Sequence, residues 1–435
     1  MALFEDFCDK SNSTKINIVE YEEDRYYLLP DHLEWYYQKK ELPISKFIIP
    51  KKNKKLNYDF GKTEFDQLLV VVTNKCNIVC DYCFRGYNFK KKDEINFEDF
   101  KKIANHFYNN AQVNPTIQFT GGEVFVKKNI EHWFKYINDK GFRIWMTTNG
   151  VSAKISNNEI IKNIFSNNHK HHIRISLDGH KAEIHEAYRQ KGTFNKIIKN
   201  IKFLKSINAS ISVKSVITKD NVQYLEEMLD MCYDLKLEGW NYNVIRYTGA
   251  LAKNPPLDST AKIDKKIEYF GYYELGVRLI EILFRKPHLS KLLAISRFGK
   301  ILNTLYLTNP KAVPMSYYVL KFDGNVYYND NLQFKKYSPG NIDEIGLDAF
   351  NGLKSFRNNY DYDLPACKKC PIHRFCFQKG DYGELYENDV TLNSEFPNCD
   401  DIRKHYFHLM SLKEKGKILT LKMFNKQENN TVANV

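Results

Sequence analysis

The 435-residue sequence contains no run of about 18 apolar residues, which a membrane-spanning helix would need. Its first residues carry Glu5 and Asp6 where a secretory signal peptide carries basic side chains. The first absence excludes a membrane-spanning helix, and the second argues against secretion. We therefore expect a cytoplasmic protein.

Acidic residues are also in deficit, with 52 Asp and Glu against 65 Lys and Arg, a net charge of +13. Such a surplus suggests an acidic partner, either nucleic acid or an acidic peptide. No appended RNA-binding module with an aromatic RNP-like motif is evident, which argues against nucleic acid. The length of the chain predicts two or three domains.

Seven of the nine cysteines fall into two clusters, and the cytosol disfavours disulfides between them. Cys76, Cys80 and Cys83 follow the apolar run Leu68–Val72, which predicts a buried strand. Three thiolates on one loop can bind three irons of a cubane cluster and leave the fourth iron open. A structural zinc site is the alternative, but it needs four ligands and the loop has no His. The spacing favours iron–sulfur.

Strand-like and helical segments alternate between Gln67 and Ile245, which predicts an α/β fold with a parallel sheet of βαβ units. Six units make a partial (β/α)6 barrel, and polar motifs follow its strands at their carboxyl ends, where such sheets place their working residues. The predicted strands are Gln67–Thr73, Thr116–Thr120, Phe142–Thr148, His172–Leu177, Ser210–Thr218 and Trp240–Ile245.

The remaining segments flank this barrel at residues 66–248. Residues 1–65 mix strand-like pieces with a helical piece, His32–Lys39, and we expect them either to bind an extended peptide or to cover a barrel end. Residues 249–315 read as a helical connection. Residues 316–410 open with a hairpin at Asp323-Gly324 and contain the second cysteine cluster, and residues 411–435 form a tail.

The first cysteine motif, with Tyr82 inside it, and Gly121-Gly122-Glu123 together resemble the radical S-adenosylmethionine (SAM) enzymes over residues 67 to about 245. The resemblance implies a partial barrel and a [4Fe-4S] cluster whose open iron binds the amino and carboxylate groups of SAM. It also implies a 5′-deoxyadenosyl radical that removes a hydrogen atom from the substrate.

The same resemblance implies the contacts to SAM. Gly121 and Gly122 would let the backbone approach the methionyl ammonium, and Glu123 would serve the same cation.

The stretch from Ile175 to Arg189 resembles the peptide- and protein-modifying branch of the family, in which Ser176 and Arg189 would hold the ribose and carboxylate. Asp178 either orients the site or starts a turn, and Asn149 either reaches the ribose or serves a turn. We expect His185 to be structural.

The second cluster, Cys367, Cys370, Cys376 and Cys399, resembles a SPASM domain, which usually holds two auxiliary clusters. Asn329 and Gly380 stand where two further cysteines are expected, so we predict one auxiliary [4Fe-4S] cluster, with zinc as the rival. Asp330 corresponds to a general base in some relatives, although it could instead cap the hairpin.

These resemblances predict a radical SAM peptide maturase that forms a C–C or thioether cross-link in a ribosomally made precursor peptide. A reducing partner such as flavodoxin or ferredoxin would supply electrons. The rivals are a formylglycine-forming sulfatase maturase, a nucleic-acid modifying enzyme and a non-catalytic metal-binding scaffold.

Overall fold

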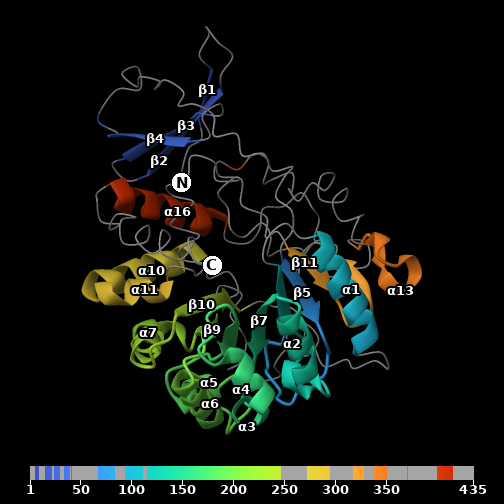
Figure 1. The fold of residues 1–435 in the computed structure, drawn as a ribbon. Helices are drawn as coiled ribbons and strands as arrows, with labels where there is room; N and C mark the ends of the chain where they lie inside the picture. Colours follow the sequence, from blue (N-terminus) through green and yellow to red (C-terminus); the bar gives the residue numbers. More distant parts are fainter. Residues whose placement is uncertain are drawn as a thin grey trace.

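The structure is a computed structural model (Figure 1). It describes residues 5–8, 15–21, 24–29, 34–39, 41, 67–83, 94–110, 115–245, 272–293, 317–327, 338–349, 370 and 399–414.

The centre of the molecule is a parallel sheet in which six strands follow one another in chain order. This confirms the predicted α/β fold with a partial (β/α)6 barrel. The strands are β5 (Gln67–Val71), β6 (Thr116–Thr120), β7 (Arg143–Thr148), β8 (His172–Ser176), β9 (Ile211–Ile217) and β10 (Gly239–Val244).

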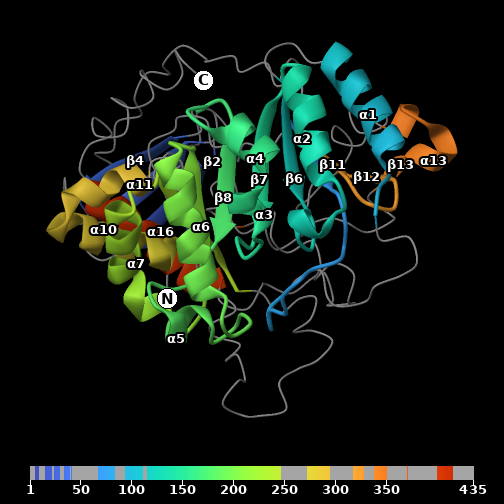
Figure 2. The ribbon, with the colours of Figure 1, turned by 60° about the horizontal axis from the view of Figure 1, so that its bottom comes forward.

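Helices α2, α4 and α6 cover one face of this sheet (Figure 2). Alternate strand residues such as Ile117, Ile144 and Val213 are fully buried and join the helices in one apolar core. Cys232 lies fully buried in the same core. The connecting elements are α1 (Phe97–Asn110), η2 (Val124–Val126), α2 (Ile130–Asp139), α3 (Lys154–Asn157), α4 (Glu159–Phe165), α5 (Ala182–His185), α6 (Phe194–Ser206), η3 (Val222–Tyr224) and α7 (Leu225–Asp234).

The opposite face of β6 to β10 carries partly exposed and mostly polar side chains, because successive strand residues point to opposite faces. We call this the polar face. Its members include Gln118, Trp145, Thr147, Arg174, Ser176, Lys214, Asn241 and Asn243.

The sheet continues beyond β5, where β11 (Tyr317–Leu320) pairs in parallel with Tyr317 opposite Gln67. The chain then turns at Gly324, whose φ is 83°, into β12 (Asn325–Tyr327), as the Asp-Gly signal predicts. With β13 (Gly340–Asn341) the sheet reaches nine strands, and α13 (Ile342–Ile345) follows it.

The predicted helical connection contains α10 (Tyr272–Arg285), η5 (Pro287–Leu289) and α11 (Ser290–Leu293). Leu275 and Leu279, about one turn apart on α10, are buried. Helix α16 (Cys399–Glu414) packs against α10. No helix among the described residues is long and apolar enough to cross a membrane.

The N-terminal residues form a separate antiparallel sheet in the order β1 (Glu5–Cys8), β2 (Lys15–Tyr21), β3 (Asp24–Leu29) and β4 (Glu34–Lys39). The predicted helix at His32–Lys39 is therefore wrong. Its aromatic residues favour a strand, and pairing of Trp35 with Leu28 of β3 overrides the helical spacing.

Candidate active site

The cysteine loop leaves β5 at the carboxyl edge of the sheet and is held there by the turn after β6. The backbone N–H of Gly122 donates to Thr73 at 2.8 Å, and that of Glu123 donates to Lys75 at 2.9 Å. A Cβ on Gly122 would lie 2.3 Å from the carbonyl oxygen of Lys75. The predicted glycine pair thus allows close backbone contact with the loop that carries Cys76, Cys80 and Cys83, all partly exposed.

Glu123 fixes the end of β7 beside this loop. Its carboxylate is 1% exposed and accepts hydrogen bonds from the Thr148 hydroxyl and the Asn149 backbone N–H, each at 2.7 Å. Burial raises the pKa of this carboxyl, and the hydrogen bonds oppose that rise. A contact of Glu123 with the SAM ammonium stays a prediction.

Asn149 lies directly against the cysteine loop. Its side-chain nitrogen donates to Asn77 Oδ1 at 2.8 Å and lies 3.8 Å from Cys76 Sγ. The structure therefore brings Asn149 to the cysteine sulfur, and its contact with the SAM ribose stays a prediction.

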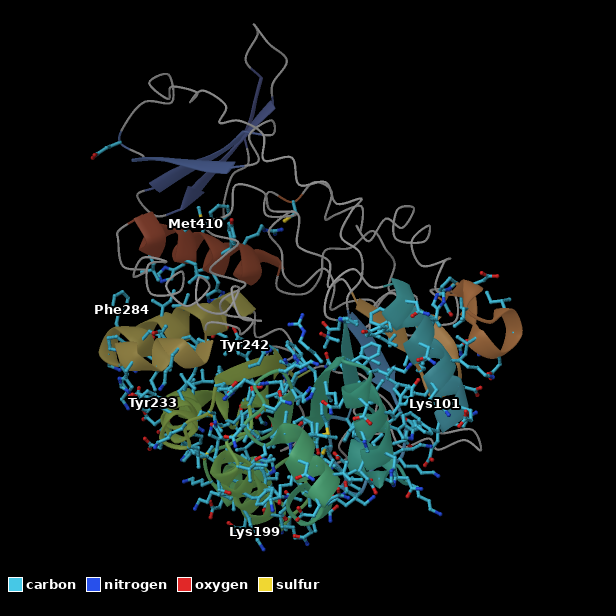
Figure 3. All side chains as sticks on the ribbon, viewed as in Figure 1. Lys101, Lys199, Tyr233, Tyr242, Phe284 and Met410 are labelled. Atoms are coloured by element: carbon cyan, nitrogen blue, oxygen red, sulfur yellow. The ribbon has the colours of Figure 1, made fainter. Side chains whose placement is uncertain are left out.

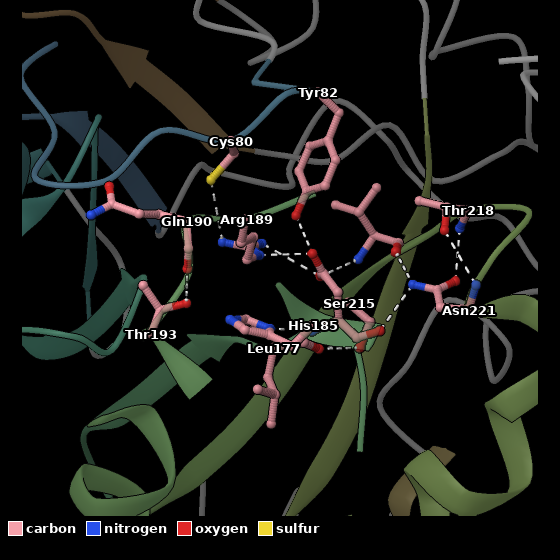
Figure 4. Close-up of polar contacts among 12 residues, drawn as sticks. Cys80, Tyr82, Leu177, His185, Arg189, Gln190, Thr193, Ser215, Thr218 and Asn221 are labelled. Carbon is pink, nitrogen blue, oxygen red and sulfur yellow. Dashed lines mark hydrogen bonds and ion pairs between the residues drawn. The ribbon is translucent and has the colours of Figure 1, made fainter. Parts of the chain in front are cut away.

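Asp178 and Arg189 form a buried ion pair next to the second cysteine (Figure 4). Their side chains are 3% and 8% exposed, and Arg189 Nε lies 2.7 Å from Asp178 Oδ2. Arg189 Nη1 also reaches Cys80 Sγ at 3.9 Å, while Tyr82 donates its hydroxyl proton to Asp178. Burial raises the pKa of the Cys80 thiol to about 12, and the charge of Arg189 opposes that rise.

Two side chains fix the backbone of Asp178, one from seven residues further along the chain and one from 43 residues further. Its N–H donates to His185 Nδ1 at 3.1 Å, and its carbonyl accepts from Asn221 Nδ2 at 2.9 Å. Burial lowers the pKa of His185 to about 4, so the ring is neutral and can accept this bond at pH 7. The sequence analysis did not identify Asn221, which carries no motif and can be found only through its contacts.

The donor set fits a cubane cluster with an open iron. Two of the three thiols have N–H donors nearby, from Asn149 at 3.8 Å and from Arg189 at 3.9 Å. Hydrogen bonds to the sulfurs adjust the reduction potential of an iron–sulfur cluster. In the described ranges no three His, Cys, Asp or Glu side chains are grouped to hold a single metal ion. Cluster binding does not require that grouping, because each thiolate would bind a different iron.

Ser176 ends β8 at the same edge, partly exposed, with Lys214 of β9 opposite it. Of the second cysteine cluster, Cys370 is described, and Arg403 Nη1 lies 3.9 Å from its sulfur. Cys399 begins α16, but its side chain lies outside the described residues, as do Cys367, Cys376 and Asp330. Their predicted roles stay predictions.

A partial barrel with three cysteines at its carboxyl edge defines a class of cluster-dependent enzymes, and comparison with known families agrees. Residues 70–232 match the radical SAM superfamily. Residues 70–232 thus form a radical SAM domain, and this family implies a [4Fe-4S] cluster and SAM.

Two curated relatives show which kinds of radical SAM enzyme the chain is similar to. The chain is 27% identical over 220 residues to the antilisterial bacteriocin subtilosin biosynthesis protein AlbA of Bacillus subtilis, covering 49% of this chain and 48% of AlbA. It is 26% identical over 335 residues to a cysteine-type anaerobic sulfatase-maturating enzyme of Clostridium novyi, covering 71% and 86%. The alignment thus spans about half the length of AlbA.

Solved structures share the fold. Streptococcus suis SuiB bound to S-adenosylmethionine superposes with a TM-score of 0.56 at 15% identity, covering 77% of this chain and 76% of SuiB. The protein anSMEcpe with bound AdoMet gives 0.64 at 18% identity, covering 83% and 97%.

Proposed function

We propose that the chain is a radical SAM peptide maturase that removes a hydrogen atom from a residue of a ribosomally made precursor peptide and forms a C–C or thioether cross-link. Bound at the carboxyl edge, the cluster and SAM would supply the 5′-deoxyadenosyl radical for that step. The observation that carries the proposal is the group of three cysteines held by Asn149 and by the Asp178–Arg189 pair.

The protein's own residues would hold and orient these groups. Cys76, Cys80 and Cys83 would bind the cluster, and the ordered N–H groups of Asn149 and Arg189 would stabilise its thiolates. Ser176 would contact SAM, in keeping with its partly exposed position at the end of β8. SuiB has also been solved bound to the precursor peptide SuiA, which supports a peptide substrate.

Forming a cross-link removes two hydrogen atoms from the peptide, one as the abstracted atom and one as a proton plus an electron. We propose that one auxiliary [4Fe-4S] cluster at Cys367, Cys370, Cys376 and Cys399 accepts that electron, and that flavodoxin or ferredoxin reduces the first cluster. The antiparallel N-terminal sheet has two edge strands, β1 and β4, that could bind an extended segment of the peptide by strand addition.

The test is anaerobic reconstitution followed by two measurements. The protein should bind about eight irons and release 5′-deoxyadenosine from SAM under reducing conditions. Replacing Cys76, Cys80 and Cys83 together by Ala should abolish the release and leave about four irons. No release from the wild-type protein would refute the enzyme assignment, and about four irons in the wild type would remove the auxiliary cluster.

A formylglycine-forming sulfatase maturase is the second candidate, favoured by the 86% coverage of the Clostridium novyi enzyme. The two reactions leave different products. A sulfatase-derived Cys peptide would gain an aldehyde that reacts with a hydrazine probe, whereas a cross-linked peptide would lose two hydrogens and stay unreactive. Asn329 and Gly380, in place of cysteines, favour the cross-linking reaction.

A further inference from the structure

The cysteine loop reaches the surface of the molecule at Val79. This residue lies between Cys76 and Cys80, and its side chain is 54% exposed, whereas its neighbour Ile78 is buried. A single exposed apolar residue is common on protein surfaces. The significance of Val79 therefore comes from its position between two cluster ligands and from the charges beside it.

The loop is joined to the segment that leads into α6 (Figure 4). The Val79 N–H donates to Gln190 Oε1 at 3.3 Å, and Cys80 pairs with Arg189 in an isolated antiparallel bridge. Lys191 follows Gln190 directly and is exposed. These contacts place the first of a series of lysines beside Val79.

Helix α6 continues this series, because four of its thirteen residues are lysines and none is acidic. The lysines are exposed or partly exposed, and Figure 3 shows Lys199 on the outer surface of the molecule. Within the described part of the chain, none of them forms an ion pair. We call this set, together with the lysine before the helix, the basic row: Lys191, Lys196, Lys199, Lys202 and Lys205.

The acidic residues near the basic row do not cancel its charge. Asp81 of the cysteine loop and Glu183 of α5, which packs against α6, are exposed. The Glu186 carboxylate accepts the Phe194 N–H at 2.9 Å and so caps the start of α6. Helix α3, also packed against α6, adds Lys154 and no acid. The surface that extends from Val79 along α6 therefore has an excess of positive charge.

We propose that Val79 and the basic row are the docking surface for a small acidic electron-transfer protein of the flavodoxin or ferredoxin class. This assignment rests on the proposed function, in which such a protein reduces the first cluster. Electron-transfer complexes use small interfaces, and opposite charges speed their formation. An apolar centre with a charged rim, as Val79 and the lysines provide, is typical of interfaces.

Docking at this surface brings the partner's redox centre next to the loop that holds Cys76 and Cys80. One electron leaves the reduced flavin or iron–sulfur centre of the partner, which is oxidised, and enters the first cluster, which is reduced. No covalent bond forms or breaks in this step.

The test measures how fast reduced flavodoxin reduces the cluster of the reconstituted protein, by anaerobic stopped-flow absorbance at low salt. Lys191→Glu combined with Lys196→Glu should lower the second-order rate constant roughly tenfold, and high salt should remove most of the difference. Val79→Asn should lower the rate constant roughly threefold at either salt concentration. Light-driven reduction by 5-deazaflavin, a small reductant that needs no docking surface, should be unchanged in every variant.

Lys140→Glu combined with Lys236→Glu is the matched control. Both lysines are exposed and lie in turns before β7 and β10, at the edge of the sheet opposite the cysteine loop. Each reversal changes the charge by −2, so either double variant goes from +13 to +9. The control should keep the wild-type rate constant to within about twofold, because its charges lie far from the docking surface.

Equal rate constants in the two double variants would overturn the proposal. Slower reduction by 5-deazaflavin in the Lys191 and Lys196 variant would also overturn it, because the lysines would then act on the cluster itself. Weaker peptide binding by that variant with an unchanged flavodoxin rate would assign the surface to the substrate and overturn it as well.

A wild-type protein that neither flavodoxin nor ferredoxin reduces, although 5-deazaflavin does, would have no such docking surface. Failure of the maturase function would instead appear as no 5′-deoxyadenosine release from the wild type after reduction by 5-deazaflavin, whatever the docking rates.

Discussion

Replacing Asp178 by Asn should destabilise the protein strongly, because it leaves the buried Arg189 charge without its partner. The carboxylate accepts hydrogen bonds from Arg189 Nε at 2.7 Å and from the Val216 N–H at 2.9 Å, as well as from Tyr82. Both members of the ion pair are less than a tenth exposed, so water cannot replace the lost contact. Breaking such a buried pair from one side costs about 3–5 kcal/mol.

For a domain of this size the loss corresponds to a fall in Tm of roughly 6–20 °C. Anaerobic calorimetry of the reconstituted protein measures it, together with iron content. Asp139→Asn is the matched control, because its ion pair with Lys135 is more than half exposed on both sides and should contribute at most about 0.5 kcal/mol.

A double variant separates the buried charge from other effects. Asp178→Asn combined with Arg189→Leu should recover part of the lost stability, because the uncompensated guanidinium is gone. The reasoning is refuted if Asp178→Asn lowers stability no more than the Asp139→Asn control does.

Three further predictions concern single side chains. His185→Asn should reduce the loss of unfolding free energy that urea unfolding measures between pH 6.5 and 5. The folded pKa of His185 is about 4 and lies below the usual 6.5. The neutral ring therefore stabilises the fold above pH 6.5, and this contribution falls by about 1.4 kcal/mol per pH unit below it. An unchanged pH slope would contradict this, and exposed His132→Asn serves as its control. Gly122→Ala should abolish iron binding, because the new Cβ would lie 2.3 Å from a carbonyl oxygen of the cysteine loop. Gly192→Ala is the control: its φ of 75° strains an Ala, but the new Cβ would lie within 4 Å of no atom of the described residues, so this variant should retain iron. Equal iron in both variants would be inconsistent with the clash. Asn149→Ala should make the cluster potential more negative in an EPR redox titration, because an N–H donor 3.8 Å from a sulfur is lost, and an unchanged potential would argue against that contact.

The barrel could be predicted from the sequence because its signals are local. Each strand is a short apolar run and each helix has one apolar face, so both can be recognised from neighbouring residues in the sequence. The segment His32–Lys39 shows where this fails. Its Trp35, Tyr36 and Tyr37 fit a strand as well as a helix, and β3 beside them decides between the two.

The site was predictable as a set of motifs but not as a network. Cys76, Cys80 and Cys83 are recognisable by their spacing alone. Besides the nearby His185, Asp178 has partners at positions 82, 189, 216 and 221, and nothing in the spacing between these segments indicates that they meet. The fold brings them together because β5, β8 and β9 end at one edge of the sheet.

The pairing of β11 with β5 has a kinetic consequence for the cysteine loop. With β6 on one side and β11 on the other, β5 is an interior strand, although it comes first in the barrel. Its amide hydrogens can then exchange with solvent only when a neighbouring strand detaches, so they should be among the slowest to exchange. The segment that leads into the three cysteines would thus open only with the sheet itself, and the thiols would stay in place through the frequent small fluctuations of the surface.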